Sequence, residues 1–549
     1  MTEKNIGVEE TVAVVLFYPT GIVHFRNLEI LKRNIPGLRF RVIIEPWVME
    51  KAADLLTHIA KEDLAIVAQN RLPETVWADT DILFLSMAYP NPFRLYLVYE
   101  AARRNIPVTA IEEVNQLALN DGIINHYFLP IDSLGVPSEI EKEKFLELGL
   151  NEETITVTGW PFFNEEVVVD SAIGLNIRKE YQIPAEKKCA LLVLGSLKEF
   201  DIVSLETRQV RHKILEIVAA GLPAHYQLVI KPHPIESASA QKEIQAQVPN
   251  AILLDPKLPI EPLLTQSDLV VNRGNSQVTL LAMLQNIPLI LVPVELRTLF
   301  HGVADSLLCD SLEQFQQCVN AYDAGNVPDY SPLIRLHFPL NQEEALGQVA
   351  GLFEESLTKG ADREKPRFHF ISILFAFLGN MEKANQVLDR FPGGSVTPLL
   401  KQLYAGEISI TLFQSLLACF PGLIPRWHLQ ALFVRMLTGQ KKPLDLSAAV
   451  TLLEGFDGAV NPHYFFPELV ARVELEFRAG RQDIAQQLMA KFYENYSVYP
   501  YYRQVFNMMH FVYSNHQKGH SLRKTLWLLT HLFTNYSRKY FKDKYKAKK

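Results

Sequence analysis

The chain has 549 residues, too many for one hydrophobic core, and this length predicts about three to four domains. Its composition is that of an ordinary globular protein, with 48% hydrophobic and 21% charged residues. The net charge of -7 argues against a dedicated nucleic-acid binder, because neutralising phosphates requires a basic surface. No apolar run reaches the roughly 18 residues of a membrane-spanning helix, and the polar first residues do not resemble a secretory signal.

Short apolar runs alternate with amphipathic stretches over the first 360 residues, which is typical of βα units on a parallel sheet. Residues 11–17 (TVAVVLF) predict a buried strand, followed by a turn and a helix over 24–34. Further strands are predicted at 39–44, 64–68, 81–86, 108–111 and 154–158. We expect these elements to form a Rossmann-like, acceptor-side domain over residues 1–165.

The same pattern restarts after residue 187. Strands are predicted at 189–194, 227–231, 251–254, 268–271 and 288–292, with helices over 203–221 and 276–285. These elements predict a second Rossmann-like domain over residues 166–360. Two such halves bind ligands in the cleft between them, at the carboxyl ends of the strands.

The strand pattern ends near residue 360, and residues 361–549 are predicted as a helical repeat domain. Residues 368–391 read as two helices joined by the turn Leu378-Gly379-Asn380, and residues 474–493 repeat the pattern around Ala479-Gly480-Arg481. The small residues Ala384 and Ala485 let the two helices of each pair pack closely. The pattern resembles a degenerate tetratricopeptide pair, and an unrelated helical bundle is the alternative.

Four cysteines, Cys189, Cys309, Cys318 and Cys419, are scattered without a CxxC pair. They predict neither a disulfide framework nor a zinc site, and they fit a reducing cytoplasm. No DxD motif follows a strand, so no metal site is predicted.

Residues 228–234 (LVIKPHP) place His233 between two prolines directly after a predicted strand. Proline cannot continue a strand ladder, so the imidazole is held at the strand's carboxyl end, where the cleft is expected. Lys231 lies two positions earlier and is expected on the same side. A fixed histidine beside a lysine can donate hydrogen bonds to a phosphate on a departing nucleotide. The alternative is a turn whose histidine is merely exposed.

Residues 268–276 (DLVVNRGNS) predict a strand, a tight glycine turn and a helix start. A helix N-terminus has unpaired N–H groups and a positive dipole end, so it is a ready anion site. Arg273 adds a positive charge, and Gly274, Asn275 and Ser276 form the turn and the cap. A plain N-cap is the alternative, and the accompanying KPHP segment favours the phosphate site.

Residues 231–234 (KPHP), 251–254 (AILL) and 267–292 together resemble the C-terminal half of glycosyltransferases with the GT-B fold. They are most similar to enzymes with an HP motif: CDP-glycerol glycerophosphotransferases, capsule polysaccharide transferases and bacterial sialyltransferases. Residues 136–138 (VPS) and 155–161 (ITVTGWP) resemble the interdomain segment of this group, which UDP-N-acetylglucosamine 2-epimerases share. In architecture the resemblance covers about residues 10–355.

The resemblance implies that His233 contacts the donor's phosphates, and that Gly274, Asn275 and Ser276 hold phosphate as well. Many members have Ser or Thr where this chain has Arg273-Gly274-Asn275, which implies donor contacts that differ in detail. HP-motif families often use cytidine-activated donors, so CMP- or CDP-linked sugars are favoured over UDP-linked ones. GT-B enzymes usually stabilise the leaving phosphate with protein groups, which suits Lys231, His233 and Arg273. No cofactor is expected beyond the activated sugar.

Two candidates compete for the role of general base. Glu112 and Glu113 follow the predicted strand 108–111, and adjacent carboxylates can give one of them the raised pKa that a base needs. The pair resembles an acidic pair of bacterial sialyltransferases, although Val114 stands where they have glycine; a solvated loop is the alternative. His24 is the rival to Glu113, because the first loop of GT-B enzymes lines the acceptor side.

The C-terminal tail joins residues 527–533 (WLLTHLF) to a basic stretch, with nine Lys/Arg between Arg523 and Lys549 and one acid, Asp543. Such a segment can lie on an anionic membrane surface. The alternative is a terminal capping helix with a frayed end. The helical spacing of residues 527–533 favours the capping helix, so we expect a cytoplasmic protein, with peripheral contact at the inner face of the membrane as the alternative.

The leading hypothesis is a bacterial, metal-independent, inverting glycosyltransferase of polysaccharide biosynthesis. It would move a sugar, such as a CMP-linked acidic sugar, or an alditol phosphate to a surface glycan, glycolipid or protein. The helical domain would recognise this acceptor or a protein partner, because repeat arrays present concave surfaces. The alternatives are a sugar-nucleotide epimerase or hydrolase of the same fold, and a non-catalytic repeat scaffold.

Overall fold

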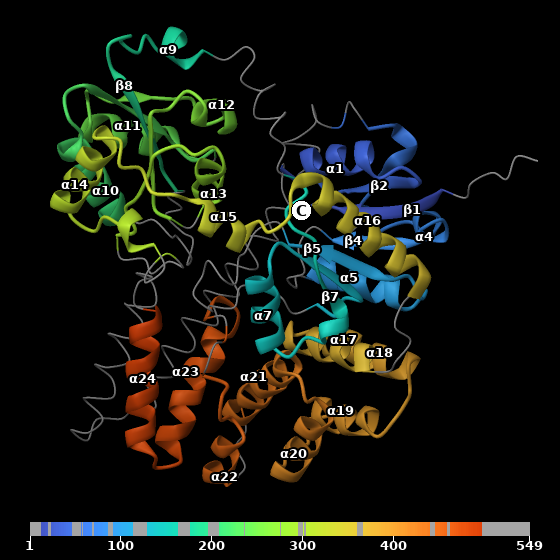
Figure 1. Cartoon of the computed structure of the whole chain (residues 1–549). Helices are drawn as coiled ribbons and strands as arrows, with labels where there is room; N and C mark the ends of the chain where they lie inside the picture. The colour runs from blue at the N-terminus through green and yellow to red at the C-terminus, as the bar shows by residue number, and fades with distance from the viewer. Residues whose placement is uncertain are drawn as a thin grey trace, which may run out of the picture.

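The computed structural model divides the chain into two parallel α/β halves followed by a helical region (Figure 1). It describes residues 12–19, 23–46, 56, 59–68, 71–85, 92–112, 129–162, 176–195, 208–234, 236–274, 276–294, 300, 304–359, 366–439, 445–457, 460 and 462–496. This order confirms the predicted fold class, α/β followed by all-α. None of the helices in these ranges combines the length and apolar composition needed to cross a bilayer.

The first half contains a parallel sheet with seven strands in the described residues, in the order β3-β2-β1-β4-β5-β6-β7. Its strands are β1 (Ala13–Tyr18), β2 (Leu38–Ile44), β3 (Leu64–Ile66), β4 (Ile82–Leu85), β5 (Val108–Ile111), β6 (Ser133–Val136) and β7 (Ile155–Val157). The helices between them are α1 (Val23–Asn34), α4 (Glu74–Ala78), α5 (Pro92–Ala102) and α7 (Glu139–Glu147), with short 3-10 turns η1 (Lys61–Asp63) and η2 (Glu152–Thr154).

The second half repeats the same winding with five strands in the described residues, in the order β10-β9-β8-β11-β12. Its strands are β8 (Lys188–Val193), β9 (Tyr226–Lys231), β10 (Ile252–Leu253), β11 (Leu269–Asn272) and β12 (Leu289–Leu291). Its helices are α9 (Ile177–Glu180), α10 (Arg208–Gly221), α11 (Ala238–Gln247), α12 (Glu261–Leu264), α13 (Gln277–Leu284), α14 (Leu312–Asp323) and α15 (Ser331–His337), with the 3-10 turn η3 (Asp305–Leu307). In both halves the strand order reverses beside the first strand, between β1 and β4 and between β8 and β11. Ligands of open α/β sheets bind at such switch points.

Both faces of each sheet are covered, which explains the nearly continuous apolar runs of the strands. In β1, Leu16 and Tyr18 face one side, while Val15 and Phe17 face the other. The Val15 side packs against α1 and against α16 (Gln342–Lys359), a helix that returns from the second half to the first. Figure 1 shows α16 lying across the first half, although residues 342–359 fall inside the second predicted range. The predicted boundaries at 165 and 360 stay predictions.

Strand β6 was missed by sequence patterning, because Ser133-Leu134-Gly135-Val136 contains few residues that favour strands. The structure explains the glycine. The Thr158 side chain lies over Gly135, and a Cβ added there would be 2.8 Å from Thr158 Cγ2. Only glycine fits between β6 and this threonine without a shift.

The helical region consists of α17 (Pro366–Phe377), α18 (Met381–Arg390), α19 (Val396–Tyr404), α20 (Ile410–Cys419), α21 (Leu423–Gly439), α22 (Leu446–Thr451), α23 (Pro462–Arg478) and α24 (Gln482–Tyr496). The two predicted helix pairs appear as α17–α18 and α23–α24, with buried Ala384 and Ala485 in the second helix of each. Their assignment to tetratricopeptide repeats stays a prediction. The predicted basic tail lies outside the described residues.

The helical region shares one hydrophobic core with the first half. Helix α17 packs against α5, where the rings of Tyr99 and Phe375 meet edge to face at 6.1 Å. A buried ion pair reinforces the contact, since Arg367 Nη1 of α17 lies 2.8 Å from both carboxylate oxygens of Asp132, just before β6. The helical region is therefore joined to the first half through its first helices, and Figure 1 shows α17 and α18 directly below α5.

The two segments that cross between the α/β halves pack against each other. Trp160 on the first crossing stacks on Phe338 on the second, with ring centroids 5.3 Å apart. Gly159 has a φ of +66°, and an added Cβ would lie 3.0 Å from the Cβ atoms of Leu340 and Ala345. Glycine is required there for both backbone and space.

Candidate active site

The carboxyl ends of β8, β9 and β11 meet at one edge of the second sheet. Val193 of β8 pairs with Lys231 of β9, and Leu192 pairs with Val271 of β11. Counting onward from these pairs, Gly195, His233 and Gly274 are corresponding positions just beyond this edge. The structure thus brings the two motifs singled out in the sequence to the same edge of the second sheet, on either side of β8.

Lys231 stabilises the KPHP turn through hydrogen bonds to the main chain. Lys231 is buried, and its ammonium donates hydrogen bonds to the carbonyl oxygens of Pro232 at 3.0 Å and Pro256 at 2.5 Å. Burial lowers the pKa of Lys231 to about 8, although nearby Asp255 acts in the opposite direction. Lys231 therefore ties the loop after β9 to the loop after β10. The side chain of His233 is partly exposed.

A buried ion pair that the sequence did not reveal supports this turn. Arg211 Nη2 of α10 lies 2.7 Å from Glu236 Oε2 and 2.7 Å from the carbonyl oxygen of Gly195. Glu236 in turn donates its backbone N–H to the carbonyl of His233 at 2.9 Å. Arg211 lies on the apolar stripe of α10 that Ile214 shares, and a charged residue on such a stripe signals a buried partner.

The turn after β11 is organised by Asn272. Its Oδ1 accepts hydrogen bonds from Gly274 N at 2.6 Å and from Thr279 Oγ1 of α13 at 3.0 Å. Gly274 has a φ of +92°, a conformation that favours glycine. Asn272 Nδ2 is buried and has no hydrogen-bond partner within the described residues. A buried amide donor without a partner in the described residues marks a polar position within this turn.

Ser276 caps helix α13, and its hydroxyl accepts a hydrogen bond from Val278 N at 3.3 Å. Arg273 is buried and donates from Nη2 to the carbonyl of Val294 at 2.8 Å. Asn275 lies outside the described residues. The structure therefore places Gly274 and Ser276 at the start of α13, while one amino group of Arg273 is committed to the main chain.

The acceptor-side candidates lie at the corresponding edge of the first sheet. Glu112 directly follows β5 and is fully buried, and His24 lies buried in the first turn of α1. At the same edge, Tyr18 at the end of β1 donates its hydroxyl proton to Glu45 Oε2 at 2.8 Å. Glu113 lies outside the described residues. Among the residues that are described, no group of three or more His, Cys, Asp or Glu side chains could hold a metal ion.

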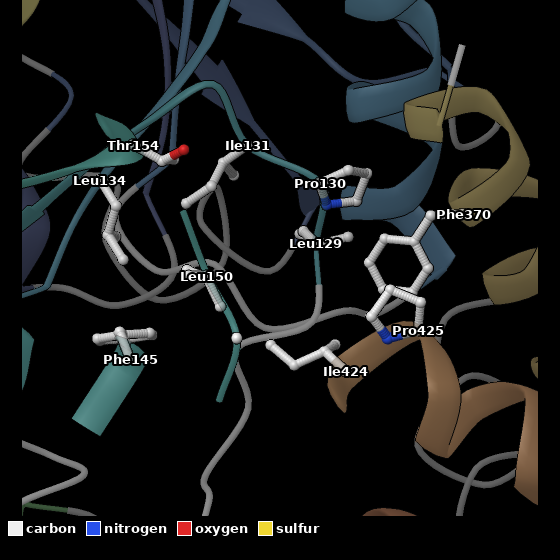
Figure 2. Close-up of a pocket in the computed structure, with 11 residues that line it drawn as sticks. Leu129, Pro130, Ile131, Leu134, Phe145, Leu150, Thr154, Phe370, Ile424 and Pro425 are labelled. Carbon is white, nitrogen blue, oxygen red and sulfur yellow. The ribbon is translucent and has the colours of Figure 1, made fainter. Parts of the chain in front are cut away.

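A cavity of about 180 Å³ lies elsewhere, where α17 and α21 meet the first half (Figure 2). Ile131, Phe145, Phe370 and Ile424 line it, and Thr154 is the polar member of its described lining. It is located at the amino ends of β6 and β7, opposite the edge that carries Glu112. The described lining contains no ionisable side chain, so we place no part of the candidate active site there.

Comparison with known proteins supports the predicted resemblance. The model of the alpha-2,8-polysialyltransferase (POLYST) family matches residues 128–271, a segment that runs from just before β6 into β11 and includes the KPHP turn. This match confirms the resemblance to glycosyltransferases that the motifs predict. No curated protein matches the chain.

Three solved structures illustrate the similar architectures. UDP-GlcNAc 2-epimerase from Neisseria meningitidis, bound to UDP-GlcNAc, shares 14% identity over 63% of this chain and 100% of its own, with a TM-score of 0.45. The wall teichoic acid polymerase TagF, soaked with CDPG, shares 13% identity over 64% of this chain and 90% of its own, with a TM-score of 0.43. HepE from Anabaena, in complex with UDP and glucose, shares 11% identity over 62% of this chain and 100% of its own, also at 0.43.

Replacing Arg211 by Met is expected to lower the free energy of unfolding by about 3–5 kcal/mol, because it leaves Glu236 buried without its cation. The control is Arg208→Met, one turn earlier on α10, where the pair with Glu243 is exposed and removal costs about 1 kcal/mol or less. Urea unfolding measures both. The double variant Arg211→Met with Glu236→Met should recover most of the loss; equal losses in the Arg211 and Arg208 single variants would contradict the assignment.

Replacing Lys231 by Met is expected to change how stability depends on pH. The folded protein releases the Lys231 proton near pH 8, whereas the unfolded chain holds it until about pH 10. The unfolded chain thus binds more protons between these values, so Lys231 makes stability rise with pH there. Relative to the variant, the wild-type protein should gain about 1–3 kcal/mol between pH 8 and pH 10. Unfolding is measured across this range with the exposed Lys257→Met variant as control, and parallel curves for wild type and Lys231→Met would contradict the prediction.

Proposed function

We propose that the chain is a glycosyltransferase that moves a sialic-acid-type sugar from a cytidine nucleotide to a hydroxyl group of a glycan acceptor. The observation that carries the proposal is the match to the alpha-2,8-polysialyltransferase family, since it spans the KPHP turn at the carboxyl end of β9, beside β8. The cytidine nucleotide rests on the predicted resemblance to HP-motif enzymes. The sugar rests on the family's name alone.

The donor's phosphate fits the edge formed by β8, β9 and β11. His233 at the KPHP turn and the N-terminus of α13 behind Gly274 and Ser276 are donors gathered there. Helix N-termini and fixed N–H groups stabilise anionic groups, and such stabilisation grows as negative charge develops on a leaving phosphate. Protein groups would then stabilise the charge of the leaving phosphate, which other transferases stabilise with a divalent ion.

The transfer itself requires one bond to form and one to break. The acceptor hydroxyl oxygen attacks the anomeric carbon while the bond between that carbon and the phosphate oxygen breaks. The nucleotide leaves with the electron pair, and His233 stabilises its charge by hydrogen bonding. A base on the opposite side removes the hydroxyl proton, so a single displacement inverts the anomeric centre.

The acceptor side is proposed to be the first half. Glu113 and His24 are the candidate bases, since Glu112 and His24 lie at the carboxyl edge of the first sheet. The helical region shares the core of this half, so it extends the surface that an acceptor or partner would meet. This arrangement supports a polymeric glycan, a glycolipid or a protein as the acceptor.

Two other functions are separated from this one by experiment. An epimerase or hydrolase of the same fold would consume the donor without an acceptor, whereas a scaffold would bind no donor. The helical region favours the transferase, because a reaction on a free sugar nucleotide has no use for an extended acceptor surface.

The donor class is tested by thermal shift and by nucleotide release. Cytidine nucleotides are expected to raise the melting temperature more than uridine or adenine nucleotides, because a ligand that binds only the folded state stabilises it. His233→Ala should remove this shift and lower CMP release about 100-fold or more. His225→Ala is the matched control, because His225 is exposed at the amino end of the same strand and pairs with Asp323. A uridine preference would overturn the donor, and release unchanged by His233→Ala would overturn the site.

The base is identified by comparing Glu113→Gln with His24→Asn. Loss of the general base lowers the rate of transfer by about 100- to 10,000-fold while donor binding stays intact. The exposed Glu62→Gln variant, at the amino end of β3, is the control and should be fully active. Single-turnover transfer with saturating donor measures the chemical step. If neither variant slows this step, the base lies elsewhere.

A further inference from the structure

Cys309 and Cys318 lie together in the second half, although nine positions separate them in the sequence. Cys309 extends the sheet beyond β12, where its N–H donates to the carbonyl of Leu291 at 2.8 Å. Cys318 lies in the middle of α14, which packs over this edge. Their Sγ atoms are 3.1 Å apart, and both thiols are free. Closing a disulfide would require the sulfur atoms to approach by about 1 Å.

The two thiols differ in access and in acidity. Cys309 is fully buried, whereas Cys318 is partly exposed and can be reached by a small reagent. The Cys309 thiol donates a hydrogen bond to Cys318, which lowers the pKa of Cys318 to about 7 and raises the pKa of Cys309. Burial raises the pKa of Cys309 further. An accessible thiolate beside a protected thiol is the arrangement of an attacking and a resolving cysteine.

We propose that Cys309 and Cys318 are a redox-active pair that closes into an intramolecular disulfide by exchange with a low-molecular-weight disulfide such as oxidised glutathione. The Cys318 thiolate attacks one sulfur of the oxidant, which forms a mixed disulfide and releases one glutathione thiolate. Cys309 then passes its proton to that thiolate and attacks Cys318 Sγ, releasing the second glutathione. Two protein thiols are oxidised to one disulfide, and one glutathione disulfide is reduced to two thiols.

The cross-link would join α14 to the outer edge of the second sheet. The same helix already contacts this sheet through Tyr322, whose hydroxyl donates to the carbonyl of Leu289 at 2.8 Å. Asp323 at the end of α14 accepts hydrogen bonds from Lys188 and His225, at the amino ends of β8 and β9. Oxidation is therefore expected to add a covalent tie to an existing contact, and to raise the melting temperature without rearranging the sheet.

The experiment equilibrates the full chain in mixtures of reduced and oxidised glutathione, then traps free thiols and measures the intact mass. A loss of two hydrogen atoms is expected, and peptide mapping should join Cys309 to Cys318. The melting temperature should rise on oxidation and return when dithiothreitol is added. A stable glutathione adduct on Cys318 without closure, or no reaction at all, would overturn the proposal.

Single variants separate the two roles. In Cys309→Ser, a mixed disulfide should accumulate on Cys318, because the resolving thiol is missing. In Cys318→Ser, the buried Cys309 should stay reduced. Cys419→Ser is the matched control, since Cys419 is also partly exposed but has no cysteine beside it in the described residues, and closure should proceed as in the wild type. These measurements need no donor or acceptor, so their failure is independent of the proposed transfer reaction.

Discussion

The ion pair between Arg211 and Glu236 holds together the segments on which the candidate donor site depends. Arg211 reaches the carbonyl of Gly195 after β8 as well as Glu236, and Glu236 is bonded to the carbonyl of His233. A buried ion pair adds little net stability compared with apolar side chains of similar size, because both charges lose their hydration. What this pair provides is geometry: it couples a helix, a strand end and the KPHP turn, so that His233 is positioned relative to β8.

A second constraint follows from the shared core of the helical region and the first half. The contacts of α17 with α5, the ion pair of Arg367 with Asp132 and the return of α16 to the first sheet join residues that are hundreds of positions apart. The second half is connected through two adjacent crossings, at Trp160 and Phe338. A movement between donor and acceptor sides would therefore carry the helical region with the first half, so an acceptor held by the helices would keep its place relative to the candidate bases.

Sequence patterning predicted most strands because the central ones are buried on both faces, and an apolar run such as 189–194 can be recognised without knowing its neighbours. It missed β6, whose Gly135 is explained by the distant Thr158. It placed His233 and the 273–276 turn at strand ends, and the sheet puts these ends at one edge, on either side of β8. It did not find Arg211 with Glu236 or Cys309 with Cys318, and scattered cysteines predicted no pairing. Residues that come into contact because a helix packs across a sheet show no periodic spacing in the sequence, so patterning cannot pair them. The roles assigned to individual site residues stay predictions.

Lys231 and Arg273, the two cations predicted to bind phosphate, already have hydrogen-bond partners in the main chain. Lys231 donates to the carbonyls of Pro232 and Pro256, and Arg273 donates to the carbonyl of Val294. Groups committed in this way shape the loops around a ligand, and their charge acts on it over distance. The candidates for direct contact are then His233, whose side chain is partly exposed, and the start of α13. Oriented N–H dipoles such as those at a helix start can bind a phosphate, and they need no reorganisation as charge develops on a leaving group.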